Sequence, residues 1–167
     1  MSPAFPALAF HRQAGRYAKA GRESLTWFLD AEDFSTCTSW VLKYGERLGM
    51  VLVDSDLRCW RVIGLVDLGV TRPFWERTLR FLVQQSVHRI DQQIVEIEPM
   101  TLEQVKARAA EAIQANPDDW RDDEAIAGEA GPPRDEQDLL DELKTAAYSA
   151  GSVPQIINAL YQEQLEG

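Results

Sequence analysis

The sequence predicts a single α+β domain in which a small mixed or antiparallel sheet of about four strands packs with helices, ending in a C-terminal helical hairpin. Three observations predict this class. Short apolar runs typical of strands lie before residue 100, and apolar residues recur at helical spacing after it. Strands and helices do not alternate as they do in a parallel α/β sheet. The 167 residues, 45% of them hydrophobic and 26% charged, fit one domain with a substantial core.

The N-terminal segment is expected to stay outside the core. Residues 1–23 mix prolines and glycines with scattered apolar residues, which is typical of a flexible arm. Its charged residues before the first acid, Glu23, are all basic: Arg12, Arg16, Lys19 and Arg22. The folded domain is therefore predicted over residues 24–167.

The strands of the first half follow from short β-prone runs. The aromatic run at 25–29 predicts a first strand. After it we expect one helix, with Asp30 or Asp33 as its N-terminal cap and Gly49 at its end. An aspartate suits the first position because its carboxylate accepts from unpaired amides, and a glycine suits the last because it adopts the left-handed conformation.

A hairpin, a helix and a further strand are expected next. Apolar runs at 50–53 and 59–66 flank the polar residues 54–56, which is the pattern of a β-hairpin. Thr71 begins a segment with apolar residues at helical spacing, and the run at 90–97 predicts another strand.

Three helices are expected in the last third of the domain. Thr101 begins a capping box, in which the hydroxyl accepts from the amide three residues on and a glutamine returns the bond. This helix should end at 116–117, because a proline disfavours helical geometry in the residue before it. Residues 135–148 carry one apolar face, and Ser152 repeats the capping pattern. The last two helices should form a hairpin.

Charge is the most uneven property of the chain. Residues 1–115 contain 14 Lys+Arg and 14 Asp+Glu, so their net charge is zero. Residues 116–167 contain 3 Lys+Arg and 13 Asp+Glu, so the net charge of −10 lies entirely there. Part of this excess falls in residues 117–134, which lack periodicity and are expected to form an acidic loop. Such a field repels phosphate and therefore disfavours nucleic acid as a partner.

Like charge concentrated in this way has two interpretations. It either attracts a basic protein or serves as a hydrated, solubilising loop. Trp120 also has two, since an aromatic residue among acids is either a binding anchor or a staple that holds the segment to the core. The residues predicted to bind a partner are Asp118, Asp119, Trp120, Asp122, Asp123, Glu124, Glu129, Asp135 and Glu136.

Searches for catalytic groups find few candidates. His11 and His88 are the only histidines, and no zinc, nucleophile-elbow or phosphate-loop motif is present. Cys37 and Cys59 are too few for a disulfide scaffold and are expected to pack as small hydrophobic residues. We therefore expect a protein that is not an enzyme and has no cofactor and no metal site.

One short segment gives an alternative enzymatic interpretation. Residues 51–56, an apolar strand ending in Asp54-Ser55-Asp56, resemble the first motif of the haloacid dehalogenase-like phosphatases. That resemblance implies a carboxylate that attacks phosphorus and a magnesium ion held by both aspartates. Arg58 stands where that family has threonine or valine, and a polar hairpin tip explains the two aspartates equally well.

The whole profile resembles the immunity proteins of polymorphic and contact-dependent bacterial toxin systems. The resemblance is one of class and is carried by the acidic residues at 120–129 and 135–140. It implies an inhibitor that masks the active site of a basic toxin domain, such as a nuclease or another nucleic-acid-modifying enzyme. Carboxylates would then occupy the places of substrate phosphates. The two cysteines, too few for a disulfide scaffold, separately favour a reducing, cytoplasmic setting.

The remaining expectations concern other partners and location. No apolar run approaches the roughly 20 residues that span a bilayer, and the chain opens without a secretory signal, so no membrane partner is expected. A second copy of the chain is the alternative partner. In that interpretation the chain is an oligomeric accessory subunit, and the last two helices bury Ile157, Leu160 and Tyr161 against the other copy.

Overall fold

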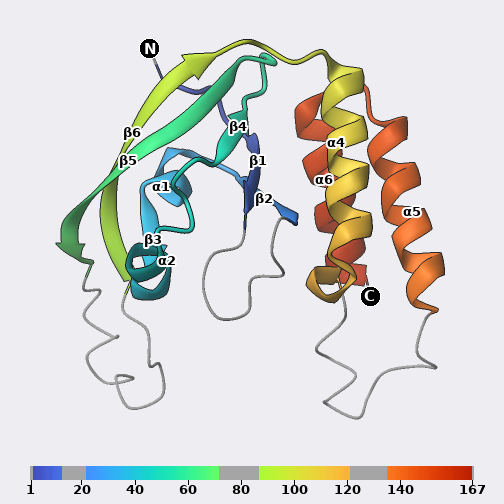
Figure 1. The fold of residues 1–167 in the computed structure, drawn as a ribbon. Helices are drawn as coiled ribbons and strands as arrows, with labels where there is room; N and C mark the ends of the chain where they lie inside the picture. The colour runs from blue at the N-terminus through green and yellow to red at the C-terminus, as the bar shows by residue number, and fades with distance from the viewer. Residues whose placement is uncertain (1, 13–21, 72–86, 121–134, 167) are drawn as a thin grey trace.

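The computed structural model describes residues 2–12, 22–71, 87–120 and 135–166 (Figure 1). It is an α+β fold with a curled, antiparallel sheet of six strands in the order β2-β1-β4-β5-β6-β3. The strands are β1 (Ala7–Arg12), β2 (Glu23–Phe28), β3 (Thr36–Thr38), β4 (Val51–Val53), β5 (Cys59–Val70) and β6 (Val87–Ile97). The predicted class is confirmed, but the sheet has two strands more than the four expected.

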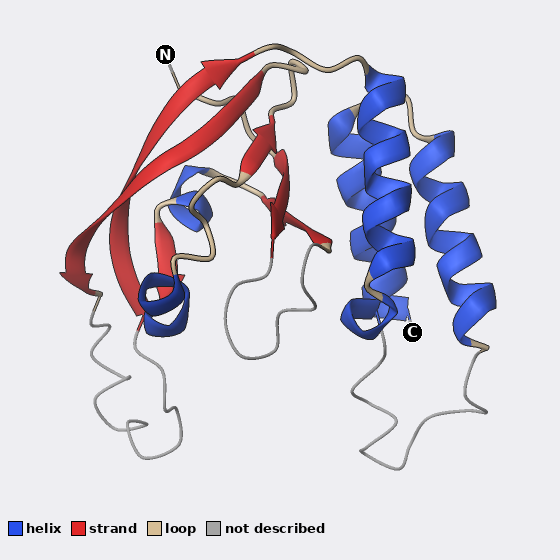
Figure 2. Cartoon of the chain, in the orientation of Figure 1, coloured by secondary structure: helices blue, strands red, loops and turns tan. Residues whose placement is uncertain are grey.

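Helices lie on both sides of this sheet (Figures 1 and 2). Two short helices, α1 and α2, lie near β3, and three longer ones form a layer at the other side of the molecule. The described helices are α1 (Ala31–Phe34), α2 (Ser39–Tyr44), α4 (Leu102–Ala115), α5 (Glu136–Ser149) and α6 (Val153–Glu166), with a 3₁₀ turn, η1 (Pro117–Trp120). None of these described helices is both long enough and apolar enough to cross a bilayer.

The flexible arm predicted for residues 1–23 is wrong where the structure describes it. Residues 7–12 form β1, which pairs with β2 on one side and β4 on the other. Leu8 is fully buried and Phe10 is 1% exposed. A continuous apolar run is what a strand buried on both faces requires, and that signal outweighs the prolines and glycines around it. Residues 13–21 lie outside the described part of the chain.

The single helix expected over residues 30–48 is also wrong. Asp30 does cap a helix, since its carboxylate accepts from the amide of Asp33 at 2.8 Å, but α1 ends after four residues. The chain then forms β3, which pairs with β6, and α2 ends at Gly45, whose φ is +63°. Pairing with β6 therefore overrides the local helical pattern, and the helix ends at Gly45 rather than at Gly49.

The remaining local predictions fare better. The strand at 25–29 corresponds to β2, the hairpin to β4 and β5, and the strand at 90–97 to β6. The three C-terminal helices are confirmed, and α5 and α6 form the expected hairpin. The helix expected to begin at Thr71 falls largely on residues 72–86, outside the described part.

The sheet and the helical layer enclose the larger of two cores. Val105, Ile113, Leu143 and Ile156 of the helices pack there against side chains of β1 and β2, and all four are at most 1% exposed. A bidentate ion pair also joins the helical layer to the sheet. The Arg108 guanidinium on α4 donates two hydrogen bonds to the Glu23 carboxylate on β2, both at 2.7 Å.

Burial in this core overturns one expected interface. Ile157 and Leu160 are fully buried within the chain, so they are not available to a second copy. Tyr161, the third residue of that prediction, is 42% exposed. A contact between copies therefore cannot bury Ile157 and Leu160 as predicted.

The capping box of α4 is present and allows a stability prediction. The Thr101 hydroxyl accepts from the amide of Gln104 at 3.3 Å, and the Gln104 side chain accepts from the amide of Thr101 at 2.8 Å. Thr101→Ala removes the acceptor and should lower the free energy of unfolding by about 1 kcal/mol. Urea denaturation followed by circular dichroism measures it. Thr101→Ser keeps the hydroxyl and should retain most of the stability; equal losses in both variants would show that the hydroxyl is not the source.

Candidate functional site

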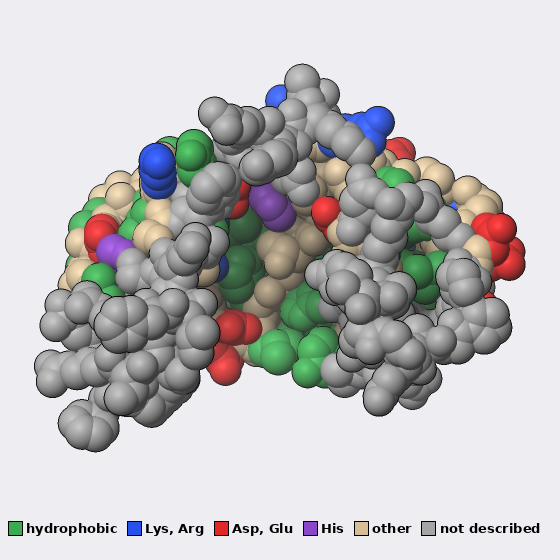
Figure 3. Space-filling view, turned by 90° about the horizontal axis from the view of Figure 1, so that it is seen from below, with side chains coloured by type: hydrophobic (Ala, Val, Ile, Leu, Met, Phe, Trp, Pro, Cys, Tyr) green, Lys and Arg blue, Asp and Glu red, His purple; other side chains and the backbone are tan. Residues whose placement is uncertain are grey.

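The acidic face of α5 is the strongest candidate site among the described residues. Leu140, Leu143 and Ala147 bury one side of α5 against α4 and α6, which turns the acidic positions outward. The helix is started by Asp135, whose carboxylate accepts from the amide of Gln137 at 2.8 Å. In Figure 3, seen from below Figure 1, a group of acidic side chains lies at the α5 side of the molecule.

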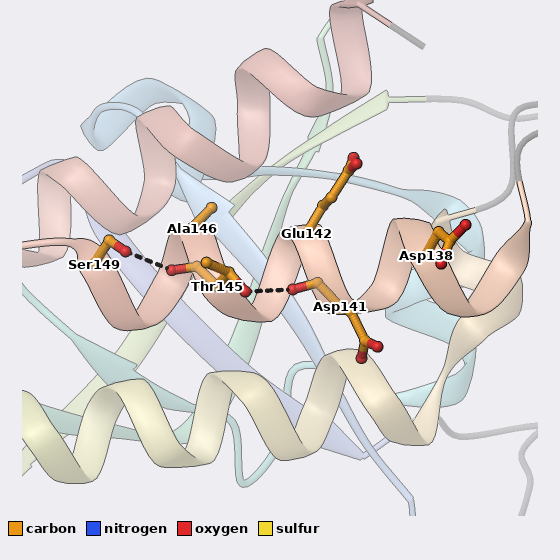
Figure 4. Close-up of a pocket in the computed structure, with 6 residues that line it drawn as sticks. All are labelled: Asp138, Asp141, Glu142, Thr145, Ala146 and Ser149. Atoms are coloured by element: carbon orange, nitrogen blue, oxygen red, sulfur yellow. Dashed lines mark hydrogen bonds between the residues drawn. The ribbon is translucent and has the colours of Figure 1, made fainter.

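A shallow depression of about 550 Å³ runs along this face. Its lining residues come from successive turns of α5 and are Asp138, Asp141, Glu142, Thr145, Ala146 and Ser149 (Figure 4). The hydroxyls of Thr145 and Ser149 donate to main-chain carbonyls one turn earlier, at 2.7 and 2.8 Å. They are therefore engaged by the helix itself, and the depression offers mainly carboxylates to a ligand.

The carboxylates of this face differ in their partners. Asp141 points towards α4 in Figure 4 and accepts from Lys144 at 2.6 Å and from Gln137 at 3.0 Å. The hydrogen bond from Lys144 holds the pKa of Asp141 below its usual value, so this group stays ionised. Asp138 is exposed and has no partner among the described residues. Asp138, Asp141 and Glu142 are nevertheless all exposed to solvent.

The other predicted binding residues fall into two groups. Asp118 and Asp119 lie in η1, which contacts α4 and α5 at the end of the helical layer where α5 begins (Figure 1). Glu136 is the first residue of α5. The structure therefore brings these acids to the same end as Asp135. The remaining predicted residues, Asp122, Asp123, Glu124 and Glu129, lie outside the described part of the chain.

Trp120 belongs to the core. Its side chain is 8% exposed and stacks on Trp27 of β2, with ring centroids 6.4 Å apart and an angle of 27° between the planes. This packing matches the interpretation in which the indole holds the segment to the domain. The ring is too buried to act as an anchor for a partner, and it instead fixes η1 and its acids against the sheet.

Asp54, the first aspartate of the phosphatase-like motif, occupies a different kind of site. Its carboxylate is fully buried and accepts from the indole nitrogen of Trp60 at 3.0 Å and from the Arg58 guanidinium at 3.2 Å. Three main-chain amides also donate to it: those of Ala4, Asp56 and Arg58, at 3.3, 3.0 and 3.0 Å. Burial raises the pKa of Asp54, but these hydrogen bonds outweigh burial and leave the pKa below its usual value.

This geometry fits a structural carboxylate at the tip of a hairpin. Both oxygens of Asp54 are already used by protein donors, whereas a nucleophile or metal ligand needs an approachable lone pair. The Asp56 side chain is 67% exposed, and its carboxylate lies 3.9 Å from the Arg58 guanidinium. Across the described ranges, no three histidine, cysteine or acidic side chains are grouped closely enough to hold a metal ion.

The histidines and cysteines do not form an activated pair. Cys37 of β3 stands opposite His88 of β6, but His88 contacts the carboxylate of Asp67 at 3.0 Å. Burial raises the pKa of the Cys37 and Cys59 thiols, so they stay protonated. Burial lowers the pKa of His11, whose Nδ1 has no hydrogen-bond partner among the described residues.

Comparison with known proteins adds no relative. The chain matches no family model, no curated protein and no solved structure.

Proposed function

We propose that this chain is a non-catalytic binding protein that captures a basic protein through the acidic face formed by η1 and α5. The observation that carries the proposal is the exposed row of carboxylates on α5, above all Asp138, Asp141 and Glu142, beside a depression with no activated nucleophile. Lysine and arginine side chains of a partner would form charge-assisted hydrogen bonds with these groups.

The class of function that fits this chemistry best is inhibition. Carboxylates fixed on a rigid helix can occupy positions that substrate phosphates take in a nuclease or another nucleic-acid-modifying enzyme. An immunity protein that masks a basic toxin domain in the cytoplasm has these properties. Opposite charge across the contact raises the association rate more than it sets the final affinity.

The test changes charge on the acidic face alone. The triple variant Asp138→Asn, Asp141→Asn, Glu142→Gln should slow association with a basic partner by about tenfold at low salt, because steering of this kind raises on-rates by 10- to 1000-fold. The partner to use is the protein encoded by the neighbouring gene, co-expressed and purified with this chain. Stopped-flow association at increasing ionic strength gives the rate and its salt dependence.

A matched control separates local from overall charge. Asp91→Asn, Glu96→Gln, Glu98→Gln removes the same three charges from exposed positions on and after β6, on the sheet side. This control should slow association much less than the α5 variant. Equal rates for both variants and the original chain, with no effect of salt, would contradict the proposal.

A further inference from the structure

The distal half of β5 has one open edge. β4 pairs with residues 59–61 only, and the contact ends where Val62 exchanges main-chain hydrogen bonds with Gly49 and Met50 at 2.9 Å each. From residue 63 to residue 70, β5 pairs with β6 on one side. On the other side, no main-chain hydrogen bond joins it to another strand within the described part of the chain.

This edge is unusually apolar. Four of the nine exposed large hydrophobic residues among those described lie on it, and they are Ile63, Val66, Leu68 and Val70, at 56, 42, 58 and 42% exposure. Edge strands are normally protected from pairing by lysine, proline or inward charges, but residues 63–70 contain no lysine, arginine or proline. The one charge, Asp67, is engaged locally by the amide of Gly69 at 2.8 Å and by His88.

The sequence of this edge complements itself. Residues 63–70 read Ile-Gly-Leu-Val-Asp-Leu-Gly-Val, which is nearly the same in both directions. An antiparallel pairing about a two-fold axis between Val66 and Asp67 places isoleucine opposite valine, glycine opposite glycine and leucine opposite leucine. Only the central pair differs, since it places Val66 opposite Asp67. A two-fold contact between identical chains requires this kind of self-complementary surface.

Charge also favours a second copy at this position. Residues 59–70 carry one basic residue, Arg61, and one acid, Asp67, so their net charge is zero. The excess of −10 lies in residues 116–167, whose described helices are on the opposite side of the molecule from the β5–β6 hairpin (Figure 1). Two copies that meet through β5 therefore keep the acids of α5 apart, which limits repulsion between the copies.

We infer that a second copy of this chain pairs antiparallel with residues 63–70 and that the two six-stranded sheets join into one across a two-fold axis. Irregularities in the β5–β6 ladder at Ile63 and Leu68 limit the length of regular strand pairing. Ile63 and Leu68 are the most exposed residues of the edge. Their side chains are therefore expected to bury much of the apolar area between the two copies. The dimer leaves the acidic face of α5 open and is independent of the function proposed for it.

Sedimentation equilibrium tests the dimer. At about 100 μM, above the micromolar dissociation constants of weak interfaces of ordinary size, the chain should show about twice its mass of 18.9 kDa. Leu68→Lys should return the mass to that of one chain, since it places a charge on the contact. The matched control Leu29→Lys, at a 48% exposed position just after β2, should remain dimeric, because β1 and β4 lie between β2 and β5 in the sheet. Circular dichroism verifies that both variants are folded.

Cysteine cross-linking tests the register. Ile63 lies opposite Val70 of the second copy, whereas two copies of Ile63 are separated by about 24 Å along the strand. A mixture of Ile63→Cys and Val70→Cys chains should form a disulfide-linked dimer, and each variant alone should not. A monomer at 100 μM, an open series of larger oligomers, a Leu68→Lys variant that stays dimeric or a mixture that fails to cross-link would each overturn the inference.

Discussion

Asp54→Asn is expected to lower the free energy of unfolding by about 3 kcal/mol at neutral pH, one of the two largest effects we foresee. Removal of one partner from a buried charged network typically costs 3–5 kcal/mol, and the partial exposure of Arg58 places this case at the lower end. Asparagine has an NH2 group in place of one carboxylate oxygen, and this group cannot accept a hydrogen bond. At least one of the present donors, such as the Trp60 indole, therefore loses its acceptor. Urea denaturation of both chains measures the difference.

The pH dependence of that difference follows from the direction of the pKa shift. The pKa of Asp54 is lower in the folded chain than in the unfolded chain, so its contribution is fully present above the unfolded pKa, near 3.9. The contribution is lost as the pH falls through the lower folded value. The two chains should therefore converge in stability only in strong acid. Asp56→Asn, at an exposed position, is the control and should change stability by less than about 0.5 kcal/mol; an equally small change in Asp54→Asn would show that the carboxylate is not structural.

Phe10→Ala should lower the free energy of unfolding by about 3–5 kcal/mol, because it removes a large side chain from a core that cannot close around the space. Phe10 is 1% exposed in β1, and the Arg108 guanidinium lies 4.4 Å above its ring. Thermal and urea unfolding followed by circular dichroism measure the loss. If the variant is too unstable to purify, Phe10→Leu should fold with a smaller loss.

This variant separates the observed strand from a flexible arm. In a flexible arm the aromatic side chain would contribute almost nothing, and Phe10→Ala would match the original chain. Arg12→Ala, two residues later at an exposed position, keeps the core intact and should have little effect. An effect of similar size in both variants would contradict the burial of β1.

Local signals in the sequence were sufficient for much of the fold. The capping box at Thr101, the proline after Asn116 and the polar turn at 54–56 each act within a few residues, and the structure has the helix and the hairpin that they predict. The predicted apolar face of residues 135–148 is the buried side of α5, since helical periodicity fixes which side of a helix is apolar. The acids that line the depression on its other side, Asp138, Asp141 and Glu142, were not among the predicted binding residues.

The errors arose where distant pairing decides the structure. β1 and β3 form because other strands accept their main-chain hydrogen bonds, and no local pattern reports those partners. The sequence of the polar turn at 54–56 likewise does not reveal whether Asp54 is buried, as the structure shows, or exposed. The open edge of β5 was missed because it depends on β4 being only three residues long, although the near-palindrome at 63–70 was readable as a signal.

The position of β1 has a consequence for how the chain folds. β1 contacts α6, so residues 7–12 meet a helix that begins about 140 positions later in the sequence. Chains dominated by such long-range contacts fold slowly, because the entropy of closing large loops must be overcome before those contacts are gained. During synthesis the sheet and its helical cover can be completed only after the last helix has left the ribosome. Until then Leu8 and Phe10 lack their final covering, and apolar side chains exposed in this way promote aggregation.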